Sequence, residues 1–247
     1  MKLNDDVHLV GSGKSGAWIT NEFDSHVYLL DGGGDLALID AGVGLEPERI
    51  LANVSNAGFD TKRITYILLT HCHADHCGGA PALRRETGAK VAMSRAEADF
   101  LRDGNEDSIG LTMARREGYY PPDYHIEPFD VDIRLGNGDE VAVGSLRIRT
   151  IHVPGHSLGS ICYLVKGKAG TYLFTGDVVF HKGEIGLLNC PGSSLGDYRE
   201  NIGKLSGLGV DALFPGHGMF TLTNGQWHID RAVEAFQSLL PPRNALR

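Results

Sequence analysis

Residues 70–79 read THCHADHCGG and concentrate more potential ligand side chains than any other stretch of this 247-residue chain. Four of the ten carry an imidazole or a carboxylate: His71, His73, Asp75 and His76. The preceding run, ITYILLT at residues 64–70, has the length and β-branched content of a buried strand. Neutral imidazole and carboxylate suit borderline divalent cations such as zinc. The segment therefore predicts a metal site in a loop that follows a strand.

Further ligand-type residues lie downstream, each in a small turn after an apolar strand. They are His156 in VPGHSLGS, Asp177 in TGDVVF and His217 in FPGHG. A glycine precedes each of them, and glycine permits the tight backbone turns needed beside a ligand. Because functional groups of α/β sheets gather where strands end, we expect these turns to meet the first segment at one site.

The residue set favours two metals over one. Within their sharp turn, His71 and His73 can point to the same metal. Asp75 and His76, one step on, can serve a second. Two cations a few ångströms apart repel each other, and a shared carboxylate offsets that repulsion, so Asp177 is the expected bridge. Protein ligands that leave coordination positions open are typical of a catalytic site.

Taken in order, HxHxDH, GHSxGS, TGD and PGHG resemble the motif series of the metallo-β-lactamase superfamily. The resemblance runs from about residue 26 to residue 217. It implies a four-layer αββα sandwich with the metals at one edge. It also implies the distribution of ligands: His71, His73 and His156 on the first metal, Asp75, His76 and His217 on the second, and Asp177 between them.

The mechanism is also implied by the resemblance. Metals in such a site lower the pKa of bound water toward ~7. The resulting bridging hydroxide attacks an ester-like carbonyl or phosphoryl centre. The family implies that Asp75 orients this hydroxide and shuttles its proton, so Asp75 and Asp177 are the expected catalytic residues. Zinc is the expected metal, with two ions per chain, and iron or manganese are the alternatives.

A bridging Asp177 favours the glyoxalase II-like branch, which includes thioesterases and lactonases, because true β-lactamases typically lack that carboxylate. Two segments depart from glyoxalase II. Residues 178–194 lack its glycine- and cysteine-rich continuation, and PPRNALR at 241–247 shows no basic clamp for glutathione. We therefore expect hydrolysis of a thioester or ester of a small molecule, with the acyl carrier left open.

Three alternatives remain. A lactonase would use the helical or loop insertion at about residues 95–125 as an apolar pocket for an acyl chain. An iron-dependent persulfide dioxygenase uses a related scaffold but holds one iron with fewer ligands. A binding or scaffold protein would carry an inert metal site.

The pattern of apolar residues predicts one domain over residues 1–247, with helices and strands interleaved. We expect a hairpin at 26–40 and helices at 47–57, 195–205 and 226–240. We expect strands at 64–70, 90–93, 140–143, 146–152, 160–165, 171–174 and 212–214. Ser94 and Glu97 resemble a capping box. Two pairs of segments also match in pattern: LALIDAG matches TYLFTGD, and TYILLTH matches DALFPGH.

Composition narrows the partners. The chain is 42% hydrophobic and 22% charged, which is ordinary for a globular enzyme. A formal charge of −8 with no basic stripe argues against nucleic acid. No apolar run approaches the ~18 residues needed to cross a membrane, and the start lacks a signal core, so a soluble cytoplasmic protein is expected. Oligomeric state is left open.

Several side chains receive supporting roles. Asp40 is expected to hydrogen-bond to the neighbouring ligand loop. His152 is expected under the turn and His181 in the pocket wall. Tyr119–Tyr124 can be a lid over the substrate or packed surface. The four cysteines are expected as reduced thiols, with Cys72 and Cys77 pointing away from the metals.

Overall fold

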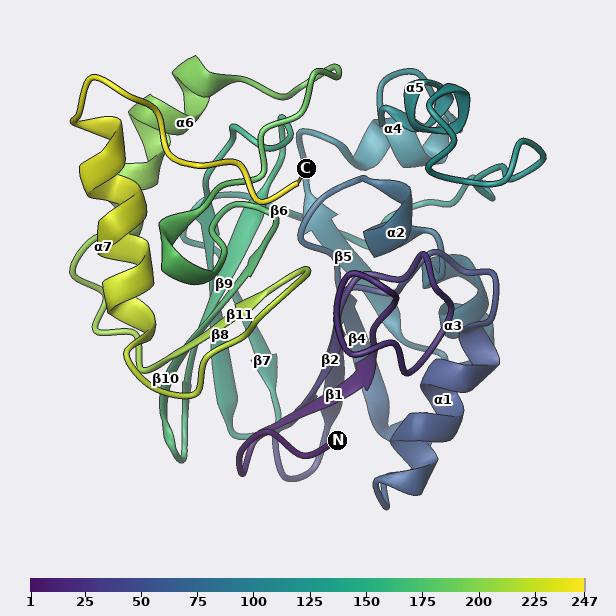
Figure 1. Cartoon of the computed structure of the whole chain (residues 1–247). Coiled ribbons are helices and arrows are strands. Elements are labelled where there is room, and N and C mark those ends of the chain that lie inside the picture. Colours follow the sequence, from purple (N-terminus) through teal and green to yellow (C-terminus); the bar gives the residue numbers. More distant parts are fainter. Residues whose placement is uncertain (247) are drawn as a thin grey trace.

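The computed structural model describes residues 1–246 and shows two β-sheets lying face to face between two layers of helices (Figure 1). Sheet A has six strands, in chain order: β1 Val7–Gly11, β2 Val27–Asp31, β3 Leu36–Ile39, β4 Ile64–Leu68, β5 Lys90–Ser94 and β6 Ile133–Leu135. Sheet B has five, in the order β11-β10-β9-β8-β7: β7 Glu140–Val143, β8 Leu146–His152, β9 Ile161–Gly167, β10 Gly170–Gly176 and β11 Ala212–Pro215.

The helices of the described chain are α1 Pro47–Asn56, α2 Ala74–Cys77, α3 Ala80–Thr87, α4 Ala98–Arg102, α5 Leu111–Arg116, α6 Leu195–Asn201 and α7 Gly225–Phe236. Short 3-10 helices lie at η1 Thr61–Arg63, η2 His181–Gly183 and η3 Ile202–Leu205. In Figure 1, α1 and α3 cover sheet A on one side of the molecule, and α6 and α7 cover sheet B on the other. The predicted αββα sandwich is confirmed.

The alternation of side chains along each strand builds these layers. In β2, Tyr28 and Leu30 point into the core between the two sheets. Val27 and Leu29 point the other way, toward the helices that cover sheet A. Because both faces of the strand are buried, its sequence is apolar throughout and shows no polar face.

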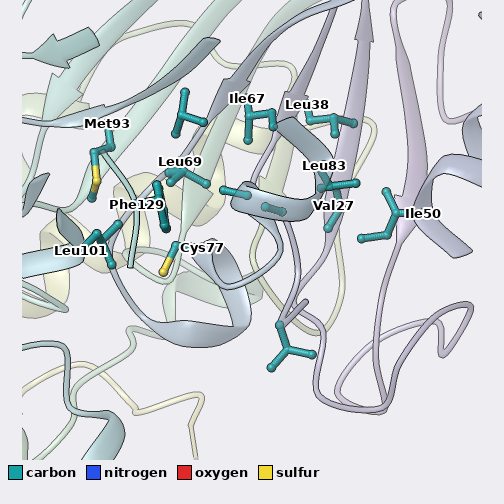
Figure 2. Packing of buried hydrophobic residues seen from close by; sticks show 14 of the residues in the cluster. Val27, Leu38, Ile50, Ile67, Leu69, Cys77, Leu83, Met93, Leu101 and Phe129 are labelled. Atoms are coloured by element: carbon teal, nitrogen blue, oxygen red, sulfur yellow. The ribbon is translucent and has the colours of Figure 1, made fainter. Parts of the chain in front are cut away.

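The outer cores join each sheet to its helices. Figure 2 shows the core of sheet A, where Leu38 and Ile67 of the sheet lie near Ile50 of α1 and Leu83 of α3. On the other side, sheet B packs on α6, η3 and α7 through an equivalent cluster. Each helix therefore buries one apolar face against a sheet, as the spacing of its apolar residues indicates.

Strand direction brings the ends of the ligand-bearing strands to one edge. In sheet A, β3 pairs parallel with β4. In sheet B, β10 pairs parallel with β11, and β8 runs in the same direction because both β8 and β10 are antiparallel to β9. The sheets meet at this edge, where the Ile161 backbone N–H donates to Thr70 O over 2.8 Å. The two pairs of matching segments noted above relate β3 to β10 and β4 to β11. The parallel pair of one sheet therefore resembles that of the other in sequence pattern.

Three expectations about local structure were wrong or incomplete. Strands β1 and β6 were not predicted: β1 contains His8 among its apolar residues, and β6 has only three residues with Arg134 in the middle. The last helix ends at Phe236, before the expected residue 240. Leu240 is 74% exposed, so no core contact extends the helix that far. The Ser94–Glu97 capping box does not form, because α4 has no side-chain cap.

None of the helices within residues 1–246 combines the length and apolar character that a bilayer span requires. All four cysteines are free, as expected. Cys72 and Cys77 are buried in the core beneath sheet A, and the Cys77 thiol donates to Cys72 O. Their side chains therefore lie on the core side of the ligand segment.

Candidate metal centre

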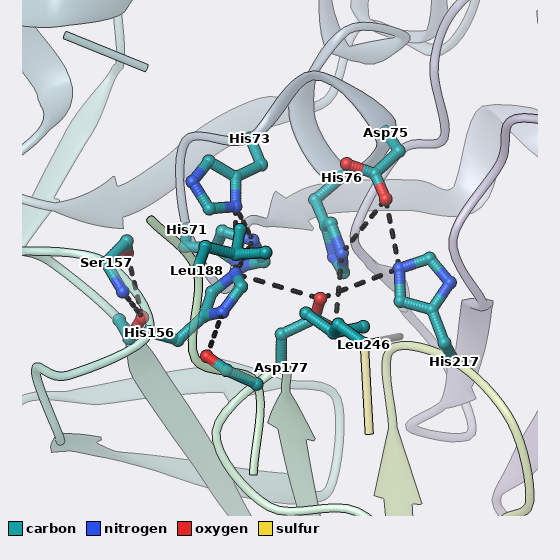
Figure 3. A network of polar contacts seen from close by, with 12 residues as sticks. His71, His73, Asp75, His76, His156, Ser157, Asp177, Leu188, His217 and Leu246 are labelled. Atoms are coloured by element: carbon teal, nitrogen blue, oxygen red, sulfur yellow. Dashed lines mark hydrogen bonds and ion pairs between the residues drawn. The ribbon is translucent and has the colours of Figure 1, made fainter. Parts of the chain in front are cut away.

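All seven predicted ligand residues converge at the shared edge of the two sheets (Figure 3). The segment after β4 supplies four of them, and α2 carries two of these four. The turns after β8, β10 and β11 supply one each. The residues are His71, His73, Asp75, His76, His156, Asp177 and His217. The spatial convergence predicted from the sequence is thus present in the structure.

Three imidazole nitrogens form the first group of donor atoms. His73 Nδ1 lies 3.1 Å from His71 Nε2 and 2.8 Å from His156 Nε2. His71 Nε2 and His156 Nε2 are 3.2 Å apart. Three ring nitrogens that face one another so closely suit a cation at their centre.

The second group joins a carboxylate to two imidazoles. Asp75 Oδ2 lies 3.0 Å from His217 Nε2 and 3.6 Å from His76 Nε2. Asp177 stands between the groups. Its Oδ1 lies 3.5 Å from His76 Nε2, and its Oδ2 lies 3.6 Å from His217 Nε2 and 3.7 Å from His156 Nε2.

Hydrogen bonds to the outer ring nitrogens orient these histidines. His156 Nδ1 lies 2.6 Å from the Gly186 carbonyl oxygen, and His76 Nδ1 lies 2.8 Å from Asp40 Oδ2. A carbonyl or a carboxylate only accepts, so each Nδ1 carries the proton. The Nε2 lone pair of each ring is left facing the centre. Such outer partners are what sets the tautomer of a metal-binding histidine.

Asp40 serves two ligands at once. Besides His76, its carboxylate accepts hydrogen bonds from the Thr70 hydroxyl and from the Thr70 backbone N–H, the latter over 2.8 Å. Since the Thr70 proton goes to Asp40, its oxygen is free to accept from His71 Nδ1, 3.0 Å away. The predicted supporting role of Asp40 is confirmed. The residue also has a left-handed backbone with φ of 63°, which costs about 1–2 kcal/mol for a non-glycine residue.

Unsatisfied buried atoms test whether a metal fits here. His76 Nε2 and Asp177 Oδ1 are buried and have no hydrogen-bond partner. A bare imidazole nitrogen facing a carboxylate oxygen is unfavourable unless a proton or a cation lies between them. Nitrogen and oxygen donors of this kind are those that zinc and similar cations prefer. The residues therefore fit two divalent cations.

The protonation tendencies of the protein groups agree with this fit. Burial lowers the pKa of His71 well below its usual value and that of His73 to about 3. These rings are neutral near pH 7, as metal ligands must be. Burial also disfavours charge on His76, but the carboxylates of Asp75 and Asp177 outweigh it and raise the pKa of His76. A positive charge is thus favoured between those carboxylates.

Glu97 is a site residue that the sequence analysis assigned to another role. Its side chain is 1% exposed and joins two ligand loops. Glu97 Oε2 accepts from the Cys72 N–H over 3.0 Å, and Oε1 accepts from the Gly159 N–H over 2.7 Å. The first loop carries His71 and the second carries His156. A buried carboxylate of this kind has no local pattern, so only the tertiary structure reveals it.

A cavity of about 830 Å³ opens over the ligand atoms. One wall comes from the segment around α5 and includes Ile109, Leu111 and Met113. His181 lines the cavity, as expected. His152 takes no part in the ligand groups, and its Nε2 lies 3.1 Å from Leu158 O.

The tyrosine-rich stretch contains both of the arrangements left open above. Tyr120 lines the cavity and its hydroxyl donates to Asp75 Oδ1 over 3.0 Å. Tyr119 also lines the cavity and is 64% exposed. Tyr124 is packed in the core, where its hydroxyl donates to Val43 O. The stretch is thus cavity wall at one end and packed core at the other.

Comparison with known proteins matches residues 20–217 to the Metallo-beta-lactamase superfamily. The chain belongs to this superfamily. It has the metallo-β-lactamase fold and brings the family's metal-ligand motifs together, so the family resemblance seen in the four motifs is confirmed.

Two relatives illustrate the similarity in sequence. A hydroxyacylglutathione hydrolase of Anaeromyxobacter dehalogenans is 36% identical over 160 residues, which cover 65% of this chain and 48% of that protein. The acyl-coenzyme A thioesterase MBLAC2 of Gallus gallus is 30% identical over 223 residues, covering 81% of this chain and 76% of the relative. The chain therefore spans about half the length of the hydroxyacylglutathione hydrolase.

Solved structures show the same fold. A metallo-β-lactamase of Cronobacter sakazakii aligns with a TM-score of 0.71 at 23% identity, covering 94% of this chain and 90% of its own. BJP-1, a subclass B3 metallo-β-lactamase of Bradyrhizobium japonicum, aligns with a TM-score of 0.72 at 22% identity, covering 95% and 89%. At these identities the likeness concerns the fold alone.

Proposed function

We propose that this protein is a metal-dependent hydrolase that cleaves a thioester of a small molecule at a dinuclear site. The observation that carries the proposal is the position of Asp177. One of its oxygens faces His76, and the other faces both His156 and His217. A carboxylate placed between two donor groups suits a pair of cations better than a single one.

The thioester substrate is supported by the relatives. Both a hydroxyacylglutathione hydrolase and an acyl-coenzyme A thioesterase are similar to this chain over most of its length. The two named substrates share an acyl thioester and differ in the carrier. The proposal is therefore limited to the shared thioester, and the carrier is left to experiment.

When bound, divalent cations would polarise a substrate oxygen and lower the pKa of a water molecule in the site. Asp75 contributes two oxygens with different surroundings. Its Oδ2 faces His217 and His76, whereas its Oδ1 accepts a hydrogen bond from the Tyr120 hydroxyl. The carboxylate can thus hold a cation through one oxygen while the other receives a proton. Tyr120 keeps the carboxylate oriented for both tasks.

The apolar cavity wall serves to exclude water and to hold the acyl group. Ile109, Leu111 and Met113 present apolar side chains on the α5 side of the cavity. Burial of apolar substrate surface there contributes to binding in proportion to the area covered. The same wall favours a second candidate function, the opening of an acyl lactone, because a lactone also presents an apolar chain.

A substrate panel run on zinc-reconstituted protein tests the proposal. Glutathione and coenzyme A thioesters, simple esters, acyl lactones and β-lactams are compared by kcat/KM. We expect a thioester to be the best substrate. A lactone turned over fastest would establish the second candidate, and one bound iron with oxygen uptake would replace both by a dioxygenase.

Removal of the proposed bridge tests the two-metal site. We expect Asp177→Ala to lose about one metal per chain and at least about 100-fold in kcat, since the two donor groups then lack their shared carboxylate. Metal content is measured by elemental analysis and turnover by thioester hydrolysis. Wild-type metal content in the variant would contradict the bridging role.

A further inference from the structure

The segment that precedes the last residue lies against the metal centre. In Figure 1 the chain leaves α7 and returns across the end of sheet B toward the middle of the molecule. Residues Arg243–Leu246, here called the strap, run beside the loop that follows η2. The proposed metal ligands include none of the strap residues.

Four hydrogen bonds attach the strap to this loop. The Ile185 N–H donates to Arg243 O, and the Ala245 N–H donates to Ile185 O, each over 2.9 Å. The Asn244 side chain pairs with the backbone of Leu187 in both directions, accepting over 3.1 Å and donating over 2.7 Å. An isolated parallel β-bridge between Ile185 and Asn244 forms there, so the strap is held against the loop.

Gly186, between the two attached residues, connects the strap to the ligands. Its carbonyl oxygen accepts the His156 Nδ1 proton. A Cβ built on Gly186 would lie 2.4 Å from Asp177 O, 2.9 Å from His156 Nδ1 and 3.1 Å from Leu246 Cδ1. Leu246 therefore reaches within a few ångströms of two proposed metal ligands.

Leu246 also forms part of the cavity wall, together with Ala245 and Leu188. Figure 3 shows Leu188 and Leu246 among the ligand side chains. All three of these side chains are aliphatic, so they offer apolar surface to a substrate close to the proposed ligands.

We propose that Leu246 and Leu188 form an acyl-selecting wall, which contacts the first carbons of the acyl group beside the scissile carbonyl. The proposal rests on the proposed thioesterase function and specifies its substrate: an acyl group without a polar substituent near the carbonyl. Asn244 is the positioning residue that holds Leu246 in place.

Chain-length dependence tests the wall. Acetyl, propionyl, butyryl and hexanoyl thioesters of one thiol are compared by kcat/KM in the wild type and in Leu246→Ala. Each buried methylene contributes about a fourfold gain. In the wild type we expect this gain in kcat/KM for each of the first carbons added. In Leu246→Ala we expect the gain per carbon to fall to about twofold or less. Asn244→Ala should shift the selectivity in the same direction.

Leu239→Ala is the matched control. Leu239 belongs to the same tail but is 98% exposed and is absent from the cavity wall. It should leave the chain-length profile unchanged. If Leu246→Ala changes kcat/KM by one common factor for all acyl lengths, or only lowers the Tm, the strap is a structural element and the acyl-selecting wall is refuted.

A binding measurement separates this test from the fate of the proposed function. Binding of the fluorescent fatty acid cis-parinaric acid is titrated without turnover in the wild type, Leu246→Ala and Leu239→Ala. If no thioester is hydrolysed but Leu246→Ala still weakens this binding several-fold relative to Leu239→Ala, the thioesterase proposal fails and the wall stands. Equal affinity in all three proteins overturns the wall whatever the substrate is.

Discussion

At the scale of single residues, the chemistry of the site depends on side chains that do not touch the metal positions. Asp40 accepts from His76 directly and from His71 through Thr70, so one carboxylate orients a ligand of each group. Glu97 joins two ligand loops through their backbone N–H groups. These contacts decide which ring nitrogen is available and how closely the loops approach.

Asp40→Asn tests the shared orientation. Asparagine tolerates the left-handed backbone at this position but offers one acceptor oxygen where the carboxylate offers two. We expect zinc affinity to fall about 10- to 100-fold with the fold retained. Competition with a chromophoric chelator measures the affinity, and circular dichroism follows the fold. Asp35→Asn, an exposed change in the same hairpin, should have no effect.

Glu97→Gln tests the junction of the loops. The amide can accept from only one of the two backbone N–H groups and presents its own N–H to the other. We expect about a tenfold weaker first metal site, formed by the three histidine nitrogens, and little change at the second. Cobalt titration, followed by its visible absorption, resolves the two binding steps. Equal weakening of both binding steps would show a general loss of structure. The substitution Glu86→Gln, at an exposed position, serves as the control.

At the scale of elements, the two parallel strand pairs explain why ligands distant in sequence meet. Pairs β3–β4 and β10–β11 end at the same edge, and the turns that leave them carry Asp40, His71, Asp177 and His217. The N-terminal segment braces the last of these turns. The His26 backbone N–H donates to Gly216 O over 2.7 Å, and His26 Nε2 lies 3.0 Å from Gly218 O.

This brace makes folding sensitive to acid. Burial lowers the pKa of His26 from 6.5 to about 4 in the folded protein. The unfolded chain therefore binds a proton that the folded chain rejects, and stability is lost as the pH falls from 6.5 toward 4. Over this range His26 lowers the free energy of unfolding by about 3 kcal/mol in total.

The measurement is the free energy of unfolding in urea across this pH range, in the wild type and in His26→Gln. Glutamine does not titrate, so the variant should lose less stability than the wild type between the two ends of the range. Identical slopes for both proteins would show that His26 does not contribute to the acid sensitivity.

At the scale of the whole molecule, the centre ties the two sheets together. Ligands come from sheet A through the segment after β4 and from sheet B through three separate turns. A cation bound by all of them stabilises the folded protein only, because the unfolded chain does not bring the donors together. Without a cation, the charges of Asp75 and Asp177 are compensated only by protons on His76 and His217, whose pKa values these carboxylates raise.

Metal removal should therefore destabilise the fold. At a free zinc concentration about 1,000 times the Kd, a bound ion contributes about 4 kcal/mol. For a chain of this size that corresponds to a Tm lower by on the order of 10 °C after chelation. Calorimetry of the protein with EDTA and after zinc addition checks this, and magnesium should not restore the Tm. An unchanged Tm would mean that the loops are held without metal.

The sequence alone indicated interleaved helices and strands and the seven ligand residues, because apolar periodicity and ligand-bearing motifs are local patterns. The αββα layers and the distribution of ligands over two metals followed from the resemblance of those motifs to a known superfamily. It did not reveal β1 or β6, in which His8 and Arg134 interrupt the apolar residues. Glu97 was assigned to a helix cap, since its residue type and spacing fit one. The tertiary structure alone placed Glu97 between two loops and Leu246 beside Gly186. Those contacts join residues far apart in the chain, and their energies depend on distance in space, which no window of sequence contains.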